Sequence, residues 1–192
     1  MTNIQVIKEM SRMFGYKLRW VSDNLAIGVA PGSSASLETV RNEGIDVILN
    51  LCAECGNLHI VERDTGFHVY WLPVRDAFAP EIEEVDAALE WLDQYLSNGK
   101  KALVHCRFGA GRSSTIIAAY LLKKGLGLGD VLERMKIAKA APTSREQLKF
   151  LSEYAEKMGV KTTQASFDLN QVGKKGRLLY YFNVVRSWIK PL

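Results

Sequence analysis

The segment from residue 101 to residue 124 limits the folds open to this chain more than any other part of its sequence. It begins with the apolar run Lys101-Ala-Leu-Val104, which is typical of a strand, and continues through a loop that contains glycines. The stretch from about Gly111 to Lys124 then has the pattern of a helix that is apolar almost all round. Such a helix is stable only where other elements cover it, so the sequence predicts a layered fold with this helix inside.

Strands and helices alternate along the remaining sequence. Strands are predicted at residues 17–29 (two short ones around a Ser-Asp-Asn turn), 45–51, 67–72 and 102–105. Helices are predicted at residues 37–43, 81–98, 111–124, 129–139 and 144–158, with a loop and a short helix within 53–65. This alternation indicates an α/β fold with a mostly parallel central sheet.

The chain length of 192 residues suits one compact domain with a small appendage. We expect the domain to occupy residues 1–158. Residues 159–173 are polar and resemble a linker, and residues 174–192 mix lysine and arginine with apolar residues. We therefore predict that residues 159–192 form a linker and a basic amphipathic helix.

Charge and cysteine content narrow the partners and the compartment. The net charge of +4 fits an anionic partner but is too small to argue for nucleic acid, so we expect no nucleic-acid partner. The three cysteines argue against a disulfide scaffold and for a reducing compartment. No apolar run approaches the roughly 18–20 residues of a membrane span, and the first ten residues lack a signal-peptide pattern. We expect a cytoplasmic monomer.

Cys106 lies at the carboxyl end of the predicted strand, where α/β sheets commonly build their sites. A free cysteine is often only a small buried apolar residue. Here, however, His105, Arg107 and Arg112 are near it in sequence, and a helix N-terminus follows. A positive field of this kind favours the thiolate form, so we predict that Cys106 is a nucleophile.

The loop after Cys106 has the residues of an anion cradle. Gly109 and Gly111 let the backbone curl tightly with its amides facing a tetrahedral oxyanion. Arg112 can bind two phosphate oxygens with its fork of N–H groups. Ser113 can donate a hydrogen bond to the sulfur and help it leave in a second step. A Walker-type loop would need Gly-Lys-Ser/Thr, which this loop lacks.

The pattern His105-Cys106-x5-Arg112-Ser113 resembles the signature of cysteine-dependent protein tyrosine phosphatases. Two further segments, 20–28 and 44–51, resemble strands of the dual-specificity branch, and the resemblance covers about 17–158. It implies a catalytic domain with a mixed, mainly parallel sheet of about four to five strands and helices on both faces.

The resemblance also implies the roles of the loop. A phosphocysteine forms on Cys106, His105 supports the nucleophile, and no metal or cofactor is needed because arginine and amides supply the positive charge. The residues expected to bind phosphate are Arg107, Phe108, Gly109, Ala110, Gly111 and Arg112.

A leaving alkoxide or phenoxide needs a proton, so a carboxyl group should face the loop. Asp76 lies in a loop after a predicted strand, at a distance before Cys106 similar to that of the family's general acid. We predict that Asp76 is the catalytic acid, and a turn or cap role is the alternative.

Gln147 has two interpretations. The segment 143–150 resembles a family segment whose glutamine helps to place the hydrolytic water. Ser144-Arg-Glu-Gln147 equally fits a helix capping box.

Cys52 and Cys55 also have alternative interpretations. They fit two structural cysteines at a strand end, and the alternatives are a metal site or a thioredoxin-like redox pair. Zinc would need two more ligands, and the spacing of the two candidates, His59 and His68, is not diagnostic. The segment 50–54 resembles phosphoinositide-type members in which the strand-end cysteine traps the nucleophile. A redox switch between Cys52 and Cys106 is therefore a further hypothesis.

These features predict a phosphomonoester hydrolase acting on phosphotyrosine, and on phosphoserine or phosphothreonine if the pocket is shallow. A phosphoinositide phosphatase is the main alternative, because Arg107 and the basic tail suit anionic lipid headgroups, although Ala110 is neutral where lipid-specific members often have lysine. A phosphate-binding module without catalysis and a rhodanese-like sulfur transferase explain fewer of the residues.

Overall fold

A computed structural model gives the fold of the chain and describes residues 15–160. Most of the predicted linker and the whole predicted C-terminal helix lie outside this range. The elements are β1 (Arg19–Trp20), β2 (Leu25–Gly28), α2 (Ser34–Asn42), β3 (Ile45–Cys52), α3 (Leu58–Asp64), β4 (His68–Val74), α4 (Ile82–Ser97), β5 (Lys101–His105), α5 (Arg112–Lys123), α6 (Leu128–Ile137) and α7 (Arg145–Lys157).

The five strands form one sheet in the order β1-β2-β5-β3-β4. Only β1 and β2 are antiparallel, and the other neighbours run parallel. The predicted α/β fold with a mixed, mainly parallel sheet is therefore confirmed. Because β5 is the middle strand, the residue that follows it emerges near the centre of the sheet's carboxyl edge.

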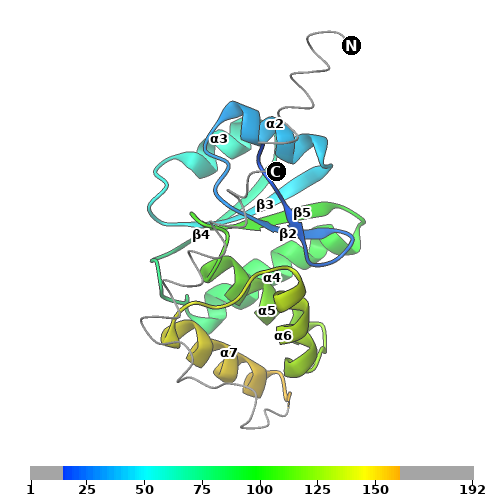
Figure 1. The fold of residues 1–192 in the computed structure, drawn as a ribbon, viewed down its shortest axis with the longest axis vertical. Helices are drawn as coiled ribbons and strands as arrows, with labels where there is room; N and C mark the ends of the chain where they lie inside the picture. The colour runs from blue at the N-terminus through cyan, green and yellow to red at the C-terminus, as the bar shows by residue number, and fades with distance from the viewer. Residues whose placement is uncertain (1–14, 161–192) are drawn as a thin grey trace, which may run out of the picture.

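Helices cover both faces of the sheet. Figure 1 shows α2 and α3 on one side and α4, α5, α6 and α7 on the other. Alternate residues of β5 point to opposite faces, so Leu103 packs in the cluster with α2 while Val104 packs in the larger cluster with α5. The smaller cluster also contains Leu37 and Val40 of α2.

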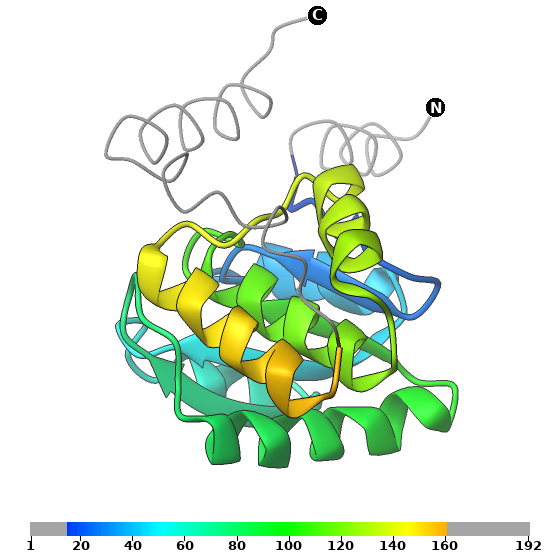
Figure 2. The same ribbon diagram turned by 90° about the horizontal axis from the view of Figure 1, so that it is seen from below.

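α5 is the buried helix that the sequence predicts. Its residues from Arg112 to Leu122 are all buried. α7 runs along it on the side away from the sheet (Figure 2). No helix within residues 15–160 is both long and apolar enough to cross a lipid bilayer.

Carboxylates of α4 tie this helix to its neighbours. Asp86 accepts a hydrogen bond of 2.6 Å from the hydroxyl of Tyr154 in α7. Asp93 accepts one of 2.7 Å from the hydroxyl of Tyr120 in α5. These two acids therefore connect helices that lie apart in the sequence.

Candidate active site

Cys106 directly follows β5, and α5 begins six residues later at Arg112. The predicted strand, loop and helix therefore meet at the expected positions. Cys106 is a free, buried cysteine that is 2% exposed. Its Sγ donates a hydrogen bond of 3.0 Å to the carbonyl oxygen of Ala110, across the loop. The thiol thus points into the curve of the loop.

Glycine is required at positions 109 and 111 by the backbone conformation and by the lack of room for a Cβ atom. Their φ angles are +61° and +54°, in the region that favours glycine. A Cβ atom at Gly109 would lie 2.4 Å from the carbonyl oxygen of Gly28, and one at Gly111 would lie 2.4 Å from Oγ1 of Thr143. The tight curl of the loop therefore depends on glycine at these two positions.

Two hydrogen-bonding details of the loop bear on the predicted roles of its residues. The N–H of Gly111 donates to the carbonyl oxygen of Ala141 at 3.1 Å, so this amide is bonded to the chain before α7 and does not face the oxyanion. The hydroxyl of Ser113 is buried and has no hydrogen-bond partner among the described residues. Its predicted bond to the sulfur belongs to the second step of the reaction and is not made in this structure, in which Cys106 Sγ donates to Ala110.

Arg112 is a deeply enclosed charged group, with 2% of its surface exposed. Its Nη2 and Nη1 donate to the two carboxylate oxygens of Glu54 at 2.7 and 2.8 Å, and Nη1 also donates to the carbonyl oxygen of Val74 at 2.8 Å. Nη2 lies 3.4 Å from Oδ1 of Asp76. Burial alone would lower the pKa of Arg112, but the hydrogen bonds that it donates to Glu54 and the charges of Cys106, Glu54 and Asp76 raise it. Arg112 is therefore held as a cation.

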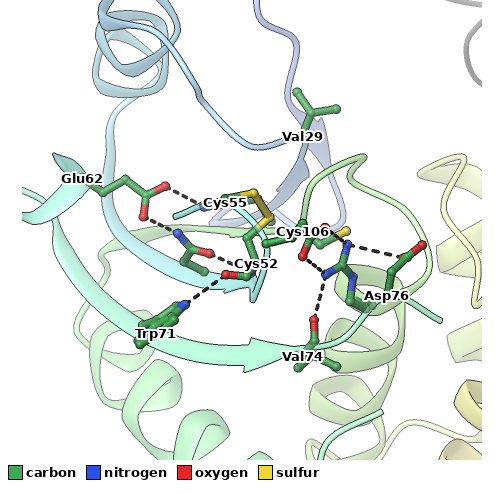
Figure 3. Close-up of a disulfide and its surroundings, with 12 residues drawn as sticks. Val29, Cys52, Cys55, Glu62, Trp71, Val74, Asp76 and Cys106 are labelled. Atoms are coloured by element: carbon green, nitrogen blue, oxygen red, sulfur yellow. Dashed lines mark hydrogen bonds and ion pairs between the residues drawn. A yellow bond between two sulfur atoms is a disulfide. The ribbon is translucent and has the colours of Figure 1, made fainter. Parts of the chain in front are cut away.

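Asp76 lies in the loop after β4, and its side chain is 51% exposed. Its contact with Arg112 places it at the same edge of the sheet as Cys106 (Figure 3). The next residue, Ala77, has a positive φ of 69°. Ser144, the N-cap of α7, donates from its hydroxyl to the carbonyl oxygen of Ala77 at 2.6 Å. The start of α7 therefore fixes the loop that carries Asp76.

Gln147 has contacts at the start of α7 and beside the phosphate loop. Its backbone N–H donates to Oγ of Ser144 at 3.1 Å, which is half of a capping box. Its side-chain oxygen accepts from the N–H of Thr143 at 2.8 Å, and its amide nitrogen donates to the carbonyl oxygen of Phe78 at 3.3 Å. The amide oxygen would lie 3.2 Å from a Cβ at Gly111, so the side chain borders the phosphate loop.

His105 belongs to a buried polar group that the sequence did not reveal. Its Nε2 lies 2.7 Å from a carboxylate oxygen of Glu62 in α3, and both side chains are fully buried. Asn50 of β3 donates to the other oxygen of Glu62 at 2.8 Å. The oxygen of Asn50 in turn accepts from the N–H of Cys52 at 2.8 Å. This chain connects the residue before the nucleophile to the end of β3.

The structure differs from the hypothesis of a Cys52–Cys106 bond. Cys52 is bonded to Cys55, with their Cα atoms 5.3 Å apart, while Cys106 is free (Figure 3). Cys55 lies three residues after Cys52, the last residue of β3, so the two sulfurs come from one local segment. Cys52, Cys55 and Glu54 also form the group of potential metal ligands among residues 15–160. Here both sulfurs are bonded to each other, and Glu54 binds Arg112.

A cavity of about 360 Å³ opens beside these groups, lined by Ala53, Glu54, Arg75, Asp76, Arg107 and Phe108. The guanidinium of Arg107 lies over the ring of Phe108, and that of Arg75 lies over the ring of Phe78. Both rings are nearly half exposed. Ala110, in contrast, is buried within the loop. Arg107 and Phe108 therefore line the cavity, whereas Ala110 is enclosed within the loop.

Two residues next to the catalytic candidates escaped sequence analysis. Glu54 differs from other acids only by its place just after a strand that ends at the same edge as β5. Glu62 has no such signal, because its short helix buries this acid while Ile60 and Val61 are exposed, the reverse of what an apolar pattern predicts. Full burial of an acid beside a histidine becomes visible only in three dimensions.

Solved structures of cysteine-dependent phosphatases share this architecture. The crystal structure of Tk-PTP in its active form is 27% identical, covers 73% of this chain and 97% of its own, and superposes with a TM-score of 0.67. The structure of PTPMT1 in complex with PI(5)P has a TM-score of 0.65 over 74% of this chain and 96% of its own, at 19% identity. The second likeness shows the fold alone.

The family described as "Polymorphic toxin system, DSP-PTPase phosphatase" matches residues 28–126, just over half of the chain. The chain belongs to this family of dual-specificity-type tyrosine phosphatases. Human dual specificity protein phosphatase 9 is 34% identical over 119 residues, which is 61% of this chain and 30% of that protein. The chain thus spans less than a third of the length of this curated relative.

Proposed function

We propose that the chain is a protein phosphatase that hydrolyses phosphotyrosine, and phosphoserine or phosphothreonine in suitable peptides, through a phosphocysteine. The observation that carries the proposal is the convergence of a free buried Cys106, a buried Arg112 and the carboxylate of Asp76 on one sheet edge. The relatives described as dual specificity protein phosphatases and the family match support the same chemistry.

The reaction follows from the roles of these groups. The thiolate of Cys106 attacks phosphorus, while Arg112 and the amides of the loop stabilise the equatorial oxygens. Asp76 donates a proton to the leaving oxygen. Water then attacks the phosphocysteine, and Asp76, now a carboxylate, takes a proton from that water. Ser113 assists the departure of sulfur, and Gln147 beside Gly111 helps to place the water.

The replacement Cys106→Ser tests the proposal. We expect turnover of p-nitrophenyl phosphate to be lost, because serine is a far weaker nucleophile than a thiolate. Binding of inorganic tungstate, measured by calorimetry, should remain, because the cradle and Arg112 are unchanged. Full turnover by this variant would contradict the phosphocysteine mechanism.

A phosphoinositide phosphatase is a second candidate. Arg75 and Arg107 border the cavity and could contact the additional phosphates of such a headgroup. Comparing phosphotyrosine peptides with inositol phospholipids in one substrate panel distinguishes the two functions. We further propose that the protein is a cytoplasmic monomer, that residues 1–158 are its catalytic domain, and that residues 159–192 form a linker and a basic helix.

A further inference from the structure

We propose that Cys52 and Cys55 form a reversible redox site that controls the phosphate-binding arginine through Glu54. The inference relies on the proposed function only in treating Arg112 as a ligand of the substrate phosphate. A disulfide between Cys52 and Cys106 would block the nucleophile, whereas the disulfide between Cys52 and Cys55 leaves Cys106 as a free thiol.

The disulfide is positioned for exchange more than for stability. It closes a loop of only four residues, Cys52 to Cys55, and cross-links restrict the unfolded chain least when the loop is short. Cys52 is 1% exposed, whereas Cys55 is half-buried. An incoming thiolate therefore has access to Cys55, and Cys52 is the sulfur that leaves.

Glu54 connects this disulfide to the active site. It stands between the two cysteines, so the bond between them restrains its backbone from both sides. Both of its carboxylate oxygens bind Arg112, at 2.7 and 2.8 Å. The hydrogen bond from Arg112 lowers the pKa of Glu54, which keeps the carboxylate ionised at neutral pH. A change at the cysteines therefore reaches the arginine through one side chain.

The hydrogen bonds of Arg112 indicate that Glu54 orients the arginine and leaves its phosphate-binding edge open. A guanidinium has five N–H groups. Both groups of Nη1 are used, by Glu54 and by the carbonyl of Val74. One group of Nη2 binds Glu54, and the other faces Asp76 across the longer distance of 3.4 Å. Nε is buried and has no partner among the described residues. Nε and the second N–H of Nη2 thus remain on one edge, which is a fork suited to two phosphate oxygens.

The redox reaction is balanced by ordinary thiol chemistry. When the pair is oxidised, the two thiols lose two protons and two electrons to hydrogen peroxide, which is reduced to two waters, and the S–S bond forms. When it is reduced, a thiolate of an external dithiol attacks Cys55 Sγ, the bond to Cys52 breaks, and Cys52 leaves as a thiolate that takes a proton. The second thiol of the dithiol then displaces Cys55, and the dithiol becomes a disulfide.

Reduction removes the restraint on Glu54. The carboxylate then exchanges between Arg112 and water, and the guanidinium no longer holds the fork in place. Because preorganised donors bind an oxyanion more tightly than mobile ones, we infer that the disulfide form binds phosphate more tightly than the dithiol form.

The test uses the full chain with the background replacement Cys106→Ser, so that oxidation of the nucleophile cannot interfere. Tungstate affinity is measured by calorimetry after treatment with hydrogen peroxide and again after dithiothreitol, and mass spectrometry identifies the Cys52–Cys55 peptide in each sample. We expect tungstate to bind about tenfold more weakly after reduction, as for the loss of one oriented, charge-assisted contact.

Two matched variants test whether the redox state of the cysteines affects Arg112 through Glu54. In Cys106→Ser/Cys55→Ser, affinity should equal that of the reduced form under both treatments. In Cys106→Ser/Glu54→Gln, affinity should be low and independent of redox state, because the amide cannot accept both N–H groups. If the Cys55 variant failed to fold, iodoacetamide treatment of the reduced background protein would block the same bond and should give the same weak affinity.

Equal tungstate affinities before and after reduction would overturn the inference. So would a redox effect that survives Glu54→Gln, or a Cys52–Cys106 peptide as the main oxidation product of the natural sequence. The outcome is separable from the proposed function, because tungstate binding requires no turnover. A chain that binds tungstate in a redox-dependent way but hydrolyses no phosphomonoester would retain this inference and lose the proposed function.

Discussion

Asp76 has the exposure and the contacts expected of a general acid that binds beside the substrate. It is half exposed, lies 3.4 Å from Arg112, and sits beside the positive φ of Ala77. The hydroxyl of Ser144 fixes that turn from α7. At the residue scale, the acid is therefore restrained by a neighbour about seventy positions away along the chain.

Asp76→Asn should slow turnover most for substrates with poor leaving groups, because those depend on protonation of the leaving oxygen. We expect a loss of about 100-fold or more for phenyl phosphate, within the range found for general acids, and a much smaller loss for p-nitrophenyl phosphate. Steady-state kinetics over a series of aryl phosphates measures this. An equal loss across the series would indicate that another group is the acid.

Glu62→Gln tests the buried partner of His105. The carboxylate accepts hydrogen bonds on both oxygens, whereas an amide offers one acceptor and brings a donor toward Asn50 or His105. The replacement should cost about 1–3 kcal/mol of folding free energy, as for a buried polar group left without its partner. Urea unfolding measures it. A variant as stable as the natural protein would contradict the tightly bonded group described above.

At the scale of elements, the helices on the side of α5 are joined by polar contacts as well as by the apolar core. Asp86 is the example with the greater burial, at 24% side-chain exposure. Burial tends to raise its pKa, but hydrogen bonds from Lys157 and Tyr154 outweigh that effect and lower it. A carboxyl group with a lowered pKa in the folded state stabilises the fold at pH values above its unfolded pKa. That contribution disappears as pH falls through the folded pKa.

Asp86→Asn should therefore destabilise the protein by about 1–2 kcal/mol at pH 7, as for a lost hydrogen bond to a charged group. The difference should shrink as pH falls below the ordinary aspartate pKa of about 4, because the natural carboxylate then becomes protonated too. Urea unfolding at pH 7 and at pH 3 measures both values. Glu133→Gln, on the exposed side of α6, is the control and should change little at either pH.

Most elements could be predicted from sequence because their patterns are local. The apolar helix around Ile116 and the paired strands before Gly28 are examples. β4 is instructive, since the sequence predicts that it ends before Pro73, yet it continues to Val74. β4 is an edge strand of the described sheet, so the missing N–H of Pro73 removes no ladder hydrogen bond on its open side.

The site was predictable only in part, for a physical reason. The signature from His105 to Ser113 is contiguous, so the loop could be recognised. The partners that hold it are not contiguous. Glu54 lies 58 positions from Arg112, and Glu62 lies 43 positions from His105. Such pairs are created by the order of the strands and leave no local pattern.

At the scale of the whole molecule, the site connects the start of α5 to segments at the ends of two other strands. Arg112 contacts the loop after β3, the end of β4 and the loop before α4. A ligand that binds Arg112 in the folded state alone must therefore stabilise the complete domain.

Tungstate at a concentration one hundred times its Kd should stabilise the protein by about 2.7 kcal/mol, by mass action. Thermal unfolding followed by circular dichroism would record this as a rise in Tm. Arg112→Ala should abolish the rise, since the variant loses the fork that binds the anion. A rise of the same size in that variant would show that tungstate stabilises the fold elsewhere.

Trp71 has a practical consequence for studying this protein in solution. Its indole N–H donates to the carbonyl oxygen of Cys52 at 3.1 Å (Figure 3). Its ring stacks on His59, with the ring centroids 4.0 Å apart. An excited indole readily transfers an electron to a nearby disulfide, which quenches its emission. Trp71 is therefore a built-in optical reporter, whose fluorescence should brighten when the Cys52–Cys55 bond opens and allow the sulfur chemistry to be followed in real time without any label.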